Sequence, residues 1–168
     1  LPAIGCLPKF SKTIYDFKKR DKNKPLILMG SERNQLIDYV LESAKEDFEE
    51  IASKYWPGAL TMVIPSLEKE NEILTSKDFT LGLRIPNSDL AQSLLRETGP
   101  LLTSSANISG FTGSITAEGI ALDFPSLKIL GPVPWGKSTG KASTIISWKK
   151  SGVWRLIRAG EVLVKEIN

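Results

Sequence analysis

Short apolar runs alternate with helical patterns along most of the chain, and this alternation limits the possible folds more than any other feature. Runs bounded by proline, glycine or polar residues predict buried strands near residues 25–29, 60–64, 80–86, 101–103, 127–130, 143–148 and 153–157. The polar stretch 66–78 is expected to form a loop or a hairpin tip.

Apolar residues spaced by three and four positions predict helices between these strands. A short helix is expected from Ser11 through Ile14 and Phe17, a longer one over residues 33–54, and others capped by Ser88 and Thr116. Such an order of elements is typical of one α/β domain with a twisted, mixed and open sheet flanked by helices.

The composition is that of an ordinary globular protein. Of 168 residues, 41% are hydrophobic and 24% are charged, which is enough for one sizeable core. No apolar run approaches the roughly 18 residues that a membrane span requires, and the first residues lack the pattern of a signal peptide. A single cysteine, Cys6, excludes an internal disulfide and fits a reducing compartment. We therefore expect a cytoplasmic protein with no membrane partner.

The chain contains no histidine. This excludes Ser-His and Cys-His catalysis and removes the commonest metal ligand. With one cysteine, a structural zinc site also has too few ligands. Any metal must then be a hard cation, which carboxylates hold or a phosphate-bearing substrate brings in.

The net charge is +3, from 22 basic and 19 acidic residues, and this value is too small to argue for nucleic-acid binding by itself. The distribution is uneven, since residues 18–24 (K-K-R-D-K-N-K) carry five basic side chains. Taken alone, such a run is typical of a solvated helix end, where cations lie near the negative end of the helix dipole. A segment that binds anions is the alternative.

Residues 131–138 (G-P-V-P-W-G-K-S) satisfy the P-loop pattern and follow a predicted strand, which at face value indicates an ATPase or kinase. Pro132 and Pro134 argue against this, because each removes a backbone N–H group of the kind with which a P-loop holds phosphate. The residues that follow favour a loop and a strand over the required helix. A Gly/Pro-rich loop beside the active site is the better interpretation, and a P-loop NTPase using Lys137 is the alternative.

A second polar cluster follows the strand predicted at 101–103. Residues 103–110 (T-S-S-A-N-I-S-G) bring together five hydroxyl or amide side chains. Open α/β sheets bind ligands at the carboxyl ends of strands, and short Ser, Thr and Asn side chains can hydrogen-bond phosphate, carboxylate or ribose. A turn that caps its own backbone is equally compatible with the spacing.

Several segments, in order, resemble the YrdC-type threonylcarbamoyl-AMP synthase family. They are residues 14–20 with 24–27 (I-Y-D-F-K-K-R and K-P-L-I), 55–61 (Y-W-P-G-A-L-T), 83–87 (L-R-I-P-N), 104–110 (S-S-A-N-I-S-G), 143–146 (S-T-I-I) and 158–160 (R-A-G). The matches span nearly the whole chain, and the W-P-G and S-S-A-N-x-S-G segments are specific in combination.

The resemblance implies both a fold and a reaction. The fold is a single YrdC-like domain over residues 1–168, beginning just after the family's N-terminal strand and its P-T-[DE]-T motif. The enzyme is a nucleotidyltransferase that forms threonylcarbamoyl-AMP and pyrophosphate from L-threonine, bicarbonate and ATP, for the N6-threonylcarbamoyladenosine modification of tRNA. ATP is a substrate that carries Mg²⁺ with it, and no resident metal is implied. Binding of tRNA or double-stranded RNA stays open.

The family's functional residues can be carried over position by position. Its Lys/Arg/Ser/Asn group falls on Lys18, Arg20, Ser105 and Asn107 as catalytic residues, with Lys18 and Arg20 clamping phosphates and the other two positioning the adenylate. The implied nucleotide-binding residues are Arg20, Lys24, Thr80, Ser105, Asn107 and Arg158, and the implied threonine site contains Arg84, Thr103 and Ser143. A family paralogue that binds RNA or nucleotide without making the adenylate is the alternative hypothesis.

Overall fold

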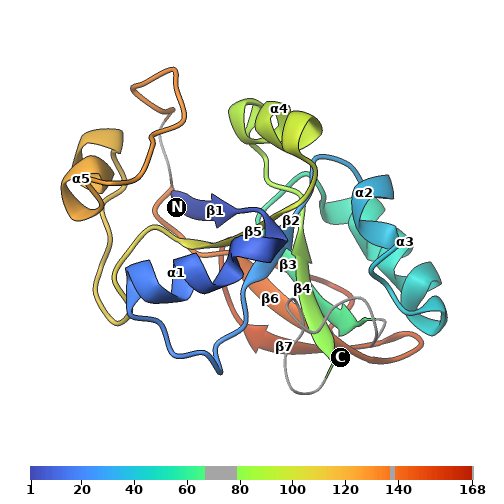
Figure 1. The fold of residues 1–168 in the computed structure, drawn as a ribbon. Coiled ribbons are helices and arrows are strands. Elements are labelled where there is room, and N and C mark those ends of the chain that lie inside the picture. Colours follow the sequence, from blue (N-terminus) through green and yellow to red (C-terminus); the bar gives the residue numbers. More distant parts are fainter. Residues whose placement is uncertain (67–78, 137–138, 168) are drawn as a thin grey trace.

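The computed structural model describes residues 1–66, 79–136 and 139–167, which form one α/β domain around a single sheet (Figure 1). The strands are β1 (Ala3–Cys6), β2 (Ile27–Met29), β3 (Leu60–Pro65), β4 (Thr80–Arg84), β5 (Leu101–Ser105), β6 (Thr144–Lys150) and β7 (Val153–Arg158). The α-helices are α1 (Ser11–Lys18), α2 (Asn34–Ile37), α3 (Lys45–Tyr55), α4 (Asp89–Thr98) and α5 (Ala117–Asp123), with 3₁₀ turns at Pro8–Phe10 and Glu42–Ala44.

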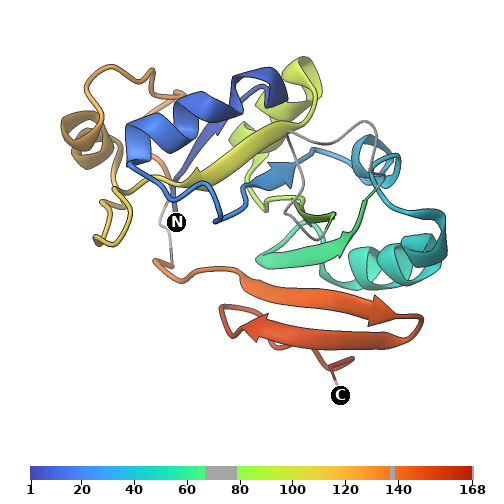
Figure 2. The ribbon, with the colours of Figure 1, turned by 60° about the horizontal axis from the view of Figure 1, so that its bottom comes forward.

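The sheet is mixed, with the strand order β1-β5-β2-β4-β3-β6-β7. The pairs β2–β4 and β3–β6 are parallel, and the other neighbouring pairs are antiparallel. Helix α1 lies beside β1 and β5, whereas α2 and α3 lie together at another side of the sheet (Figure 1). The β6–β7 hairpin runs along one edge of the molecule (Figure 2). The predicted fold class is thus confirmed.

The core forms where alternate strand residues point to one face of the sheet. Leu28, Met62, Leu83, Leu102 and Ile146 have no exposed surface. Buried residues of the helices complete this cluster, among them Ile14, Leu36, Phe48 and Ile51. The residues next to these in each strand point to the opposite face, which is therefore free to form a site.

Two predicted caps are confirmed. The Ser88 Oγ accepts a hydrogen bond from the Ala91 N–H at 3.3 Å at the start of α4, and the Thr116 Oγ1 accepts one from the Gly119 N–H at 3.2 Å at the start of α5. Each hydroxyl satisfies a backbone donor that a helix start leaves unpaired. None of the helices in the described ranges is long and apolar enough to cross a membrane.

The long helix predicted over residues 33–54 is wrong, because the chain leaves the helical path between α2 and α3. Val40 forms an isolated bridge with Ser66, and the Leu41 N–H donates to the Pro65 carbonyl at 3.0 Å. These contacts pair residues 40–41 with the C-terminal end of β3, so the helix does not continue there. The apolar spacing persists across the break because Val40, Ala44 and Phe48 are all buried, so the pattern alone did not show the interruption.

Two strand assignments also need correction. Residues 127–130 form no strand, because Leu127 closes a turn by donating its N–H to the Phe124 carbonyl at 3.0 Å. Its apolar side chain packs on the core from a loop. Strand β1 was not predicted, since it has only four residues and contains a glycine, yet it pairs with β5 along its whole length. Most of the loop predicted at 66–78 lies outside the described residues.

Candidate active site

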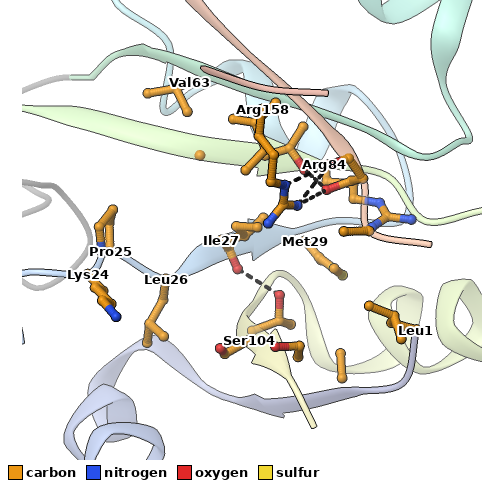
Figure 3. A pocket seen from close by; sticks show the side chains of 18 of the residues that line it. Leu1, Lys24, Pro25, Leu26, Ile27, Met29, Val63, Arg84, Ser104 and Arg158 are labelled. Carbon is orange, nitrogen blue, oxygen red and sulfur yellow. Dashed lines mark hydrogen bonds between the residues drawn. The ribbon is translucent and has the colours of Figure 1, made fainter. Parts of the chain in front are cut away.

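A cavity of about 450 Å³ opens on the face of the sheet opposite the core residues (Figure 3). Its floor is made by alternate residues of the central strands, which include Ile27, Met29, Thr61, Val63, Thr80, Gly82, Arg84, Thr103 and Ile145. The period-2 alternation of a strand explains this, because each of these residues is next to a fully or nearly fully buried one.

One wall comes from the basic segment between α1 and β2, through Arg20, Asn23 and Lys24. The Arg20 Nε donates to the Lys24 carbonyl at 3.1 Å, and its Nη2 donates to the Pro25 carbonyl at 2.9 Å. The Tyr15 hydroxyl donates to the same Lys24 carbonyl at 3.2 Å. Burial lowers the pKa of Arg20 from its ordinary value. The segment is therefore folded back on itself by its own arginine and is not a free charged loop.

A second wall comes from the end of β5. The Thr103 Oγ1 donates to the Ile27 carbonyl at 2.9 Å, which ties β5 to β2 (Figure 3). Ser104 and Ser105 line the cavity beyond it. The Asn107 side chain organises the following turn, because its Nδ2 donates to the carbonyls of Ile108 at 2.9 Å and Phe111 at 2.8 Å.

Lys18 lies beneath this turn and is only 1% exposed. Its ammonium group donates to the backbone carbonyls of Ser105 and Asn107, the latter at 2.6 Å, and to the Asn107 Oδ1 at 3.3 Å. The Ser105 hydroxyl donates to the same Asn107 Oδ1. Burial, with a smaller contribution from the charge of Arg20, lowers the pKa of Lys18 to about 8. Lys18, Ser105 and Asn107 thus form one hydrogen-bonded group, with Lys18 holding the turn from below, and Arg20 is near enough for its charge to act on Lys18.

The far end of the cavity contains two further guanidinium groups, on β4 and β7. The Arg84 Nε donates to the Gly58 carbonyl at 2.9 Å. The Arg158 Nε and Nη2 donate to the Ser143 carbonyl at 3.1 and 2.8 Å, and Nη2 also contacts the Ser143 Oγ at 3.2 Å (Figure 3). Desolvation lowers the pKa of both arginines. These bonds hold both guanidinium groups in place, and within the described ranges they use only some of the N–H donors of each group.

The Ser143 Oγ also lies 2.9 Å from the Thr61 Oγ1, so two hydroxyls and one guanidinium form a continuous polar chain. Thr61 is 1% exposed and was not predicted as a site residue. Two signals could have found it. It ends the Y-W-P-G-A-L-T segment, and it lies between Leu60 and Met62, whose burial places Thr61 on the opposite face of β3.

Most of the predicted site residues share this cavity. Arg20, Lys24, Thr80, Arg84, Thr103, Ser105, Ser143 and Arg158 line it, whereas Lys18 and Asn107 do not and instead shape the turn behind it. Asn23, Ser104 and Lys141 also line it and were not predicted. The individual roles of these residues remain predictions.

The chemistry of the lining favours anions. Among the residues that the structure describes, it contains arginine, lysine, hydroxyl and amide groups and no carboxylate. No group of three or more His, Cys, Asp or Glu side chains that could hold a metal occurs in the described part of the chain. The donors therefore fit a phosphate- and carboxylate-bearing ligand better than a resident cation.

The P-loop interpretation is not supported by the residues around it. Lys137 and Ser138 lie outside the described residues, and residues 139–143 lead as coil into β6. A P-loop needs a helix at this point, with its N-terminus facing the phosphate. The Gly131–Gly136 stretch is also absent from the residues that line the cavity.

Comparison with known proteins identifies the family. The Sua5/YciO/YrdC family model, described as "Telomere recombination", matches residues 2–160. The chain belongs to the Sua5/YciO/YrdC family. It is 33% identical over 160 residues to the threonylcarbamoyl-AMP synthase of Bacillus subtilis (strain 168), which covers 94% of this chain and 45% of that relative. It is 35% identical over 134 residues to the synthase of Yersinia pestis (strain Pestoides F), covering 76% of this chain and 70% of the relative.

A solved structure of this family is also similar. The P. abyssi Sua5 protein complexed with L-threonine superimposes with a TM-score of 0.81 at 29% identity, covering 94% of this chain and 47% of that one. The chain therefore spans less than half the length of the B. subtilis and P. abyssi relatives.

Proposed function

We propose that this chain is a nucleotidyltransferase that forms threonylcarbamoyl-AMP and pyrophosphate from L-threonine, bicarbonate and ATP, in the cytoplasm, for tRNA modification. The observation that carries the proposal is the single cavity that the basic segment, the β5 turn and the two far arginines share. The names of the B. subtilis and Y. pestis relatives support this activity, and the P. abyssi protein's complex with L-threonine supports an amino-acid substrate.

The near end of the cavity suits the triphosphate and nucleoside. Arg20 and Lys24 place positive charge at one wall, and Ser104 and Ser105 place hydroxyl donors at the other. Charge-assisted contacts of this kind bind phosphate strongly, and an arginine can do so with two parallel bonds. Mg²⁺ would arrive on the ATP, since the described part of the lining supplies no carboxylate for it.

The far end suits the amino acid. Arg84 offers a guanidinium for the carboxylate, and the Thr61–Ser143 pair offers hydroxyls for the substrate hydroxyl. Arg158 keeps Ser143 oriented through its contacts to both the carbonyl and the Oγ of that residue. The two ends are joined by the strand floor, so both substrates can lie in one cavity.

The chemistry then requires no protein nucleophile. The threonine nitrogen combines with bicarbonate to give a carbamate and water. A carbamate oxygen attacks the α-phosphorus of ATP, and the bond from that phosphorus to the bridging oxygen breaks, so that pyrophosphate leaves. Orientation of two anions and stabilisation of the charge on phosphorus are the protein's contribution. This suits a chain with no histidine and a cationic cavity.

The test is pyrophosphate release with ATP and bicarbonate, with and without L-threonine. Release that depends on L-threonine supports the proposal. Hydrolysis of ATP to ADP and phosphate that does not depend on L-threonine, and that Lys137→Ala abolishes, supports a P-loop NTPase instead. An absence of release, together with salt-sensitive RNA binding that substitutions in residues 18–24 weaken, supports the paralogue hypothesis.

A further inference from the structure

Gly82 lies at the centre of the cavity floor, where one row of paired residues crosses the sheet. Ile27 of β2 pairs with Gly82 on one side, Val63 of β3 pairs with it on the other, and Thr103 of β5 pairs with Ile27. All four residues line the cavity. Because the other three carry side chains and Gly82 does not, the row has a notch between Ile27 and Val63.

Neither the backbone nor the packing requires glycine at this position. Gly82 has extended strand geometry without a positive φ, and glycine weakens a strand interior. A Cβ added to Gly82 would lie 3.5 Å from the Ile27 Cγ1 and 3.7 Å from the Thr61 Cγ2, which are ordinary contacts. By contrast, a Cβ on Gly160 would lie 2.4 Å from backbone atoms of Ser143 and Thr144. The space at Gly82 is therefore left to the cavity.

The notch has apolar walls and polar surroundings. The atoms nearest to its base are carbons of Ile27 and Thr61. The Thr61 Oγ1 is hydrogen-bonded to the Ser143 Oγ at 2.9 Å. Arg84 follows Gly82 by two positions on the same face of β4, and two such residues are about 7 Å apart. A small molecule can therefore place a methyl group in the notch with its carboxylate on Arg84 and a hydroxyl on the Thr61–Ser143 pair.

We propose that Gly82 is a specificity-determining position: its notch receives the side-chain methyl group of the amino-acid substrate and limits the size of that side chain. The proposal rests on the proposed function, because it assigns the amino acid to the Arg84 end of the cavity. It predicts that filling the notch penalises L-threonine more than L-serine, whose side chain lacks only the methyl group.

The experiment compares kcat/KM for the two amino acids in the wild-type chain and in Gly82→Val, with pyrophosphate release as the readout. Valine suits a strand, and its two methyl groups would occupy the notch. We expect the threonine-to-serine ratio of kcat/KM to fall by about tenfold or more, since one methyl group in a tight pocket is worth about 10- to 200-fold. The KM for ATP should stay unchanged.

Gly5→Val is the matched control. Gly5 is an exposed strand glycine of β1 outside the cavity lining, and a Cβ there would meet side-chain carbons of Thr103 and Leu101 at 3.5 and 3.6 Å. This variant should keep the wild-type ratio. If Gly82→Val does not fold, Gly82→Ala replaces it, since its methyl group makes only ordinary contacts, and the ratio should fall by a smaller factor.

An unchanged ratio in the folded Gly82 variant overturns the inference, as does an equal fall for both amino acids. If the wild-type chain releases no pyrophosphate with either amino acid, the proposed function fails, and calorimetric titration with L-threonine and L-serine then decides the notch separately. Tighter binding of L-threonine than of L-serine that Gly82→Val abolishes supports the assignment of the notch. No binding of either amino acid, or a preference for threonine that the substitution leaves unchanged, overturns that assignment.

Discussion

Replacing Lys18 by methionine removes the ammonium group that holds the β5 turn while keeping a side chain of similar length. Lys18 is 1% exposed, and its ammonium donates to the carbonyls of Ser105 and Asn107 and to the Asn107 Oδ1. Methionine cannot donate to any of these oxygens. The substitution therefore leaves acceptors unpaired beneath the turn while the apolar stem still packs.

The magnitude follows from these contacts. A hydrogen bond to a charged group contributes about 1.5–3 kcal/mol, and a buried acceptor left unpaired costs about 1–3 kcal/mol. Part of this is offset because Lys18 no longer has to be desolvated, a cost that its lowered pKa of about 8 reflects. We expect a net loss of about 2–4 kcal/mol in the free energy of unfolding at neutral pH, against a total of about 5–15 kcal/mol for a typical domain.

The assay is urea unfolding followed by circular dichroism, with linear extrapolation to water. Lys12→Met is the control, because Lys12 is exposed on the same helix α1, and such surface changes usually stay within about 0.5 kcal/mol. Equal stabilities of the two variants would refute the view that the Lys18 ammonium anchors the turn.

Three further predictions concern charge and packing. Because burial holds the pKa of Lys18 at about 8 instead of 10.5, the unfolded chain binds more protons between these values. The stability difference between wild type and Lys18→Met should therefore grow as pH rises from 8 to 10.5 in a urea series, and a flat difference contradicts this. Arg20→Ala should weaken nucleotide binding about tenfold or more in a titration. Lys149→Ala is the control and should have little effect, because Lys149 is at an exposed position of β6 outside the cavity. Equal effects of the two substitutions on nucleotide affinity count against the proposed site. Asp47→Ala should cost about 2 kcal/mol of unfolding free energy, since its carboxylate accepts from the Trp148 Nε1 at 2.6 Å and the Gly152 N–H at 3.0 Å, and unchanged thermal stability would show that these bonds contribute nothing.

Local patterns were sufficient to predict much of the fold. The strands at 60–64 and 101–103 follow from short apolar runs, and the Ser88 and Thr116 caps follow from side-chain chemistry. The break in the helix over 33–54 was not predictable in this way, because it depends on the pairing of Val40 with Ser66 across the fold. Tertiary pairing there overrides a helical periodicity that continues through the break.

The site was predicted less evenly. The resemblance to the family brought Arg20 and Ser105 into one site, although they are far apart in sequence, and the structure shows that both line one cavity. Lys18 was expected to clamp phosphate, and its burial under the turn was missed. The spacing of four residues between Ile14 and Lys18 is a signal for this burial, because it places both side chains on the same face of the helix. That face is the buried one, since Ile14 is 1% exposed whereas Phe17 is 40% exposed.

The central claim is that one cavity holds the nucleotide and the amino acid together. The most direct test is a crystal structure of the chain with L-threonine and a non-hydrolysable ATP analogue. We predict triphosphate density between Arg20, Lys24 and the Ser104–Ser105 wall, with the threonine carboxylate on Arg84. Density for either ligand only outside this cavity, at concentrations that saturate binding in solution, would contradict the account.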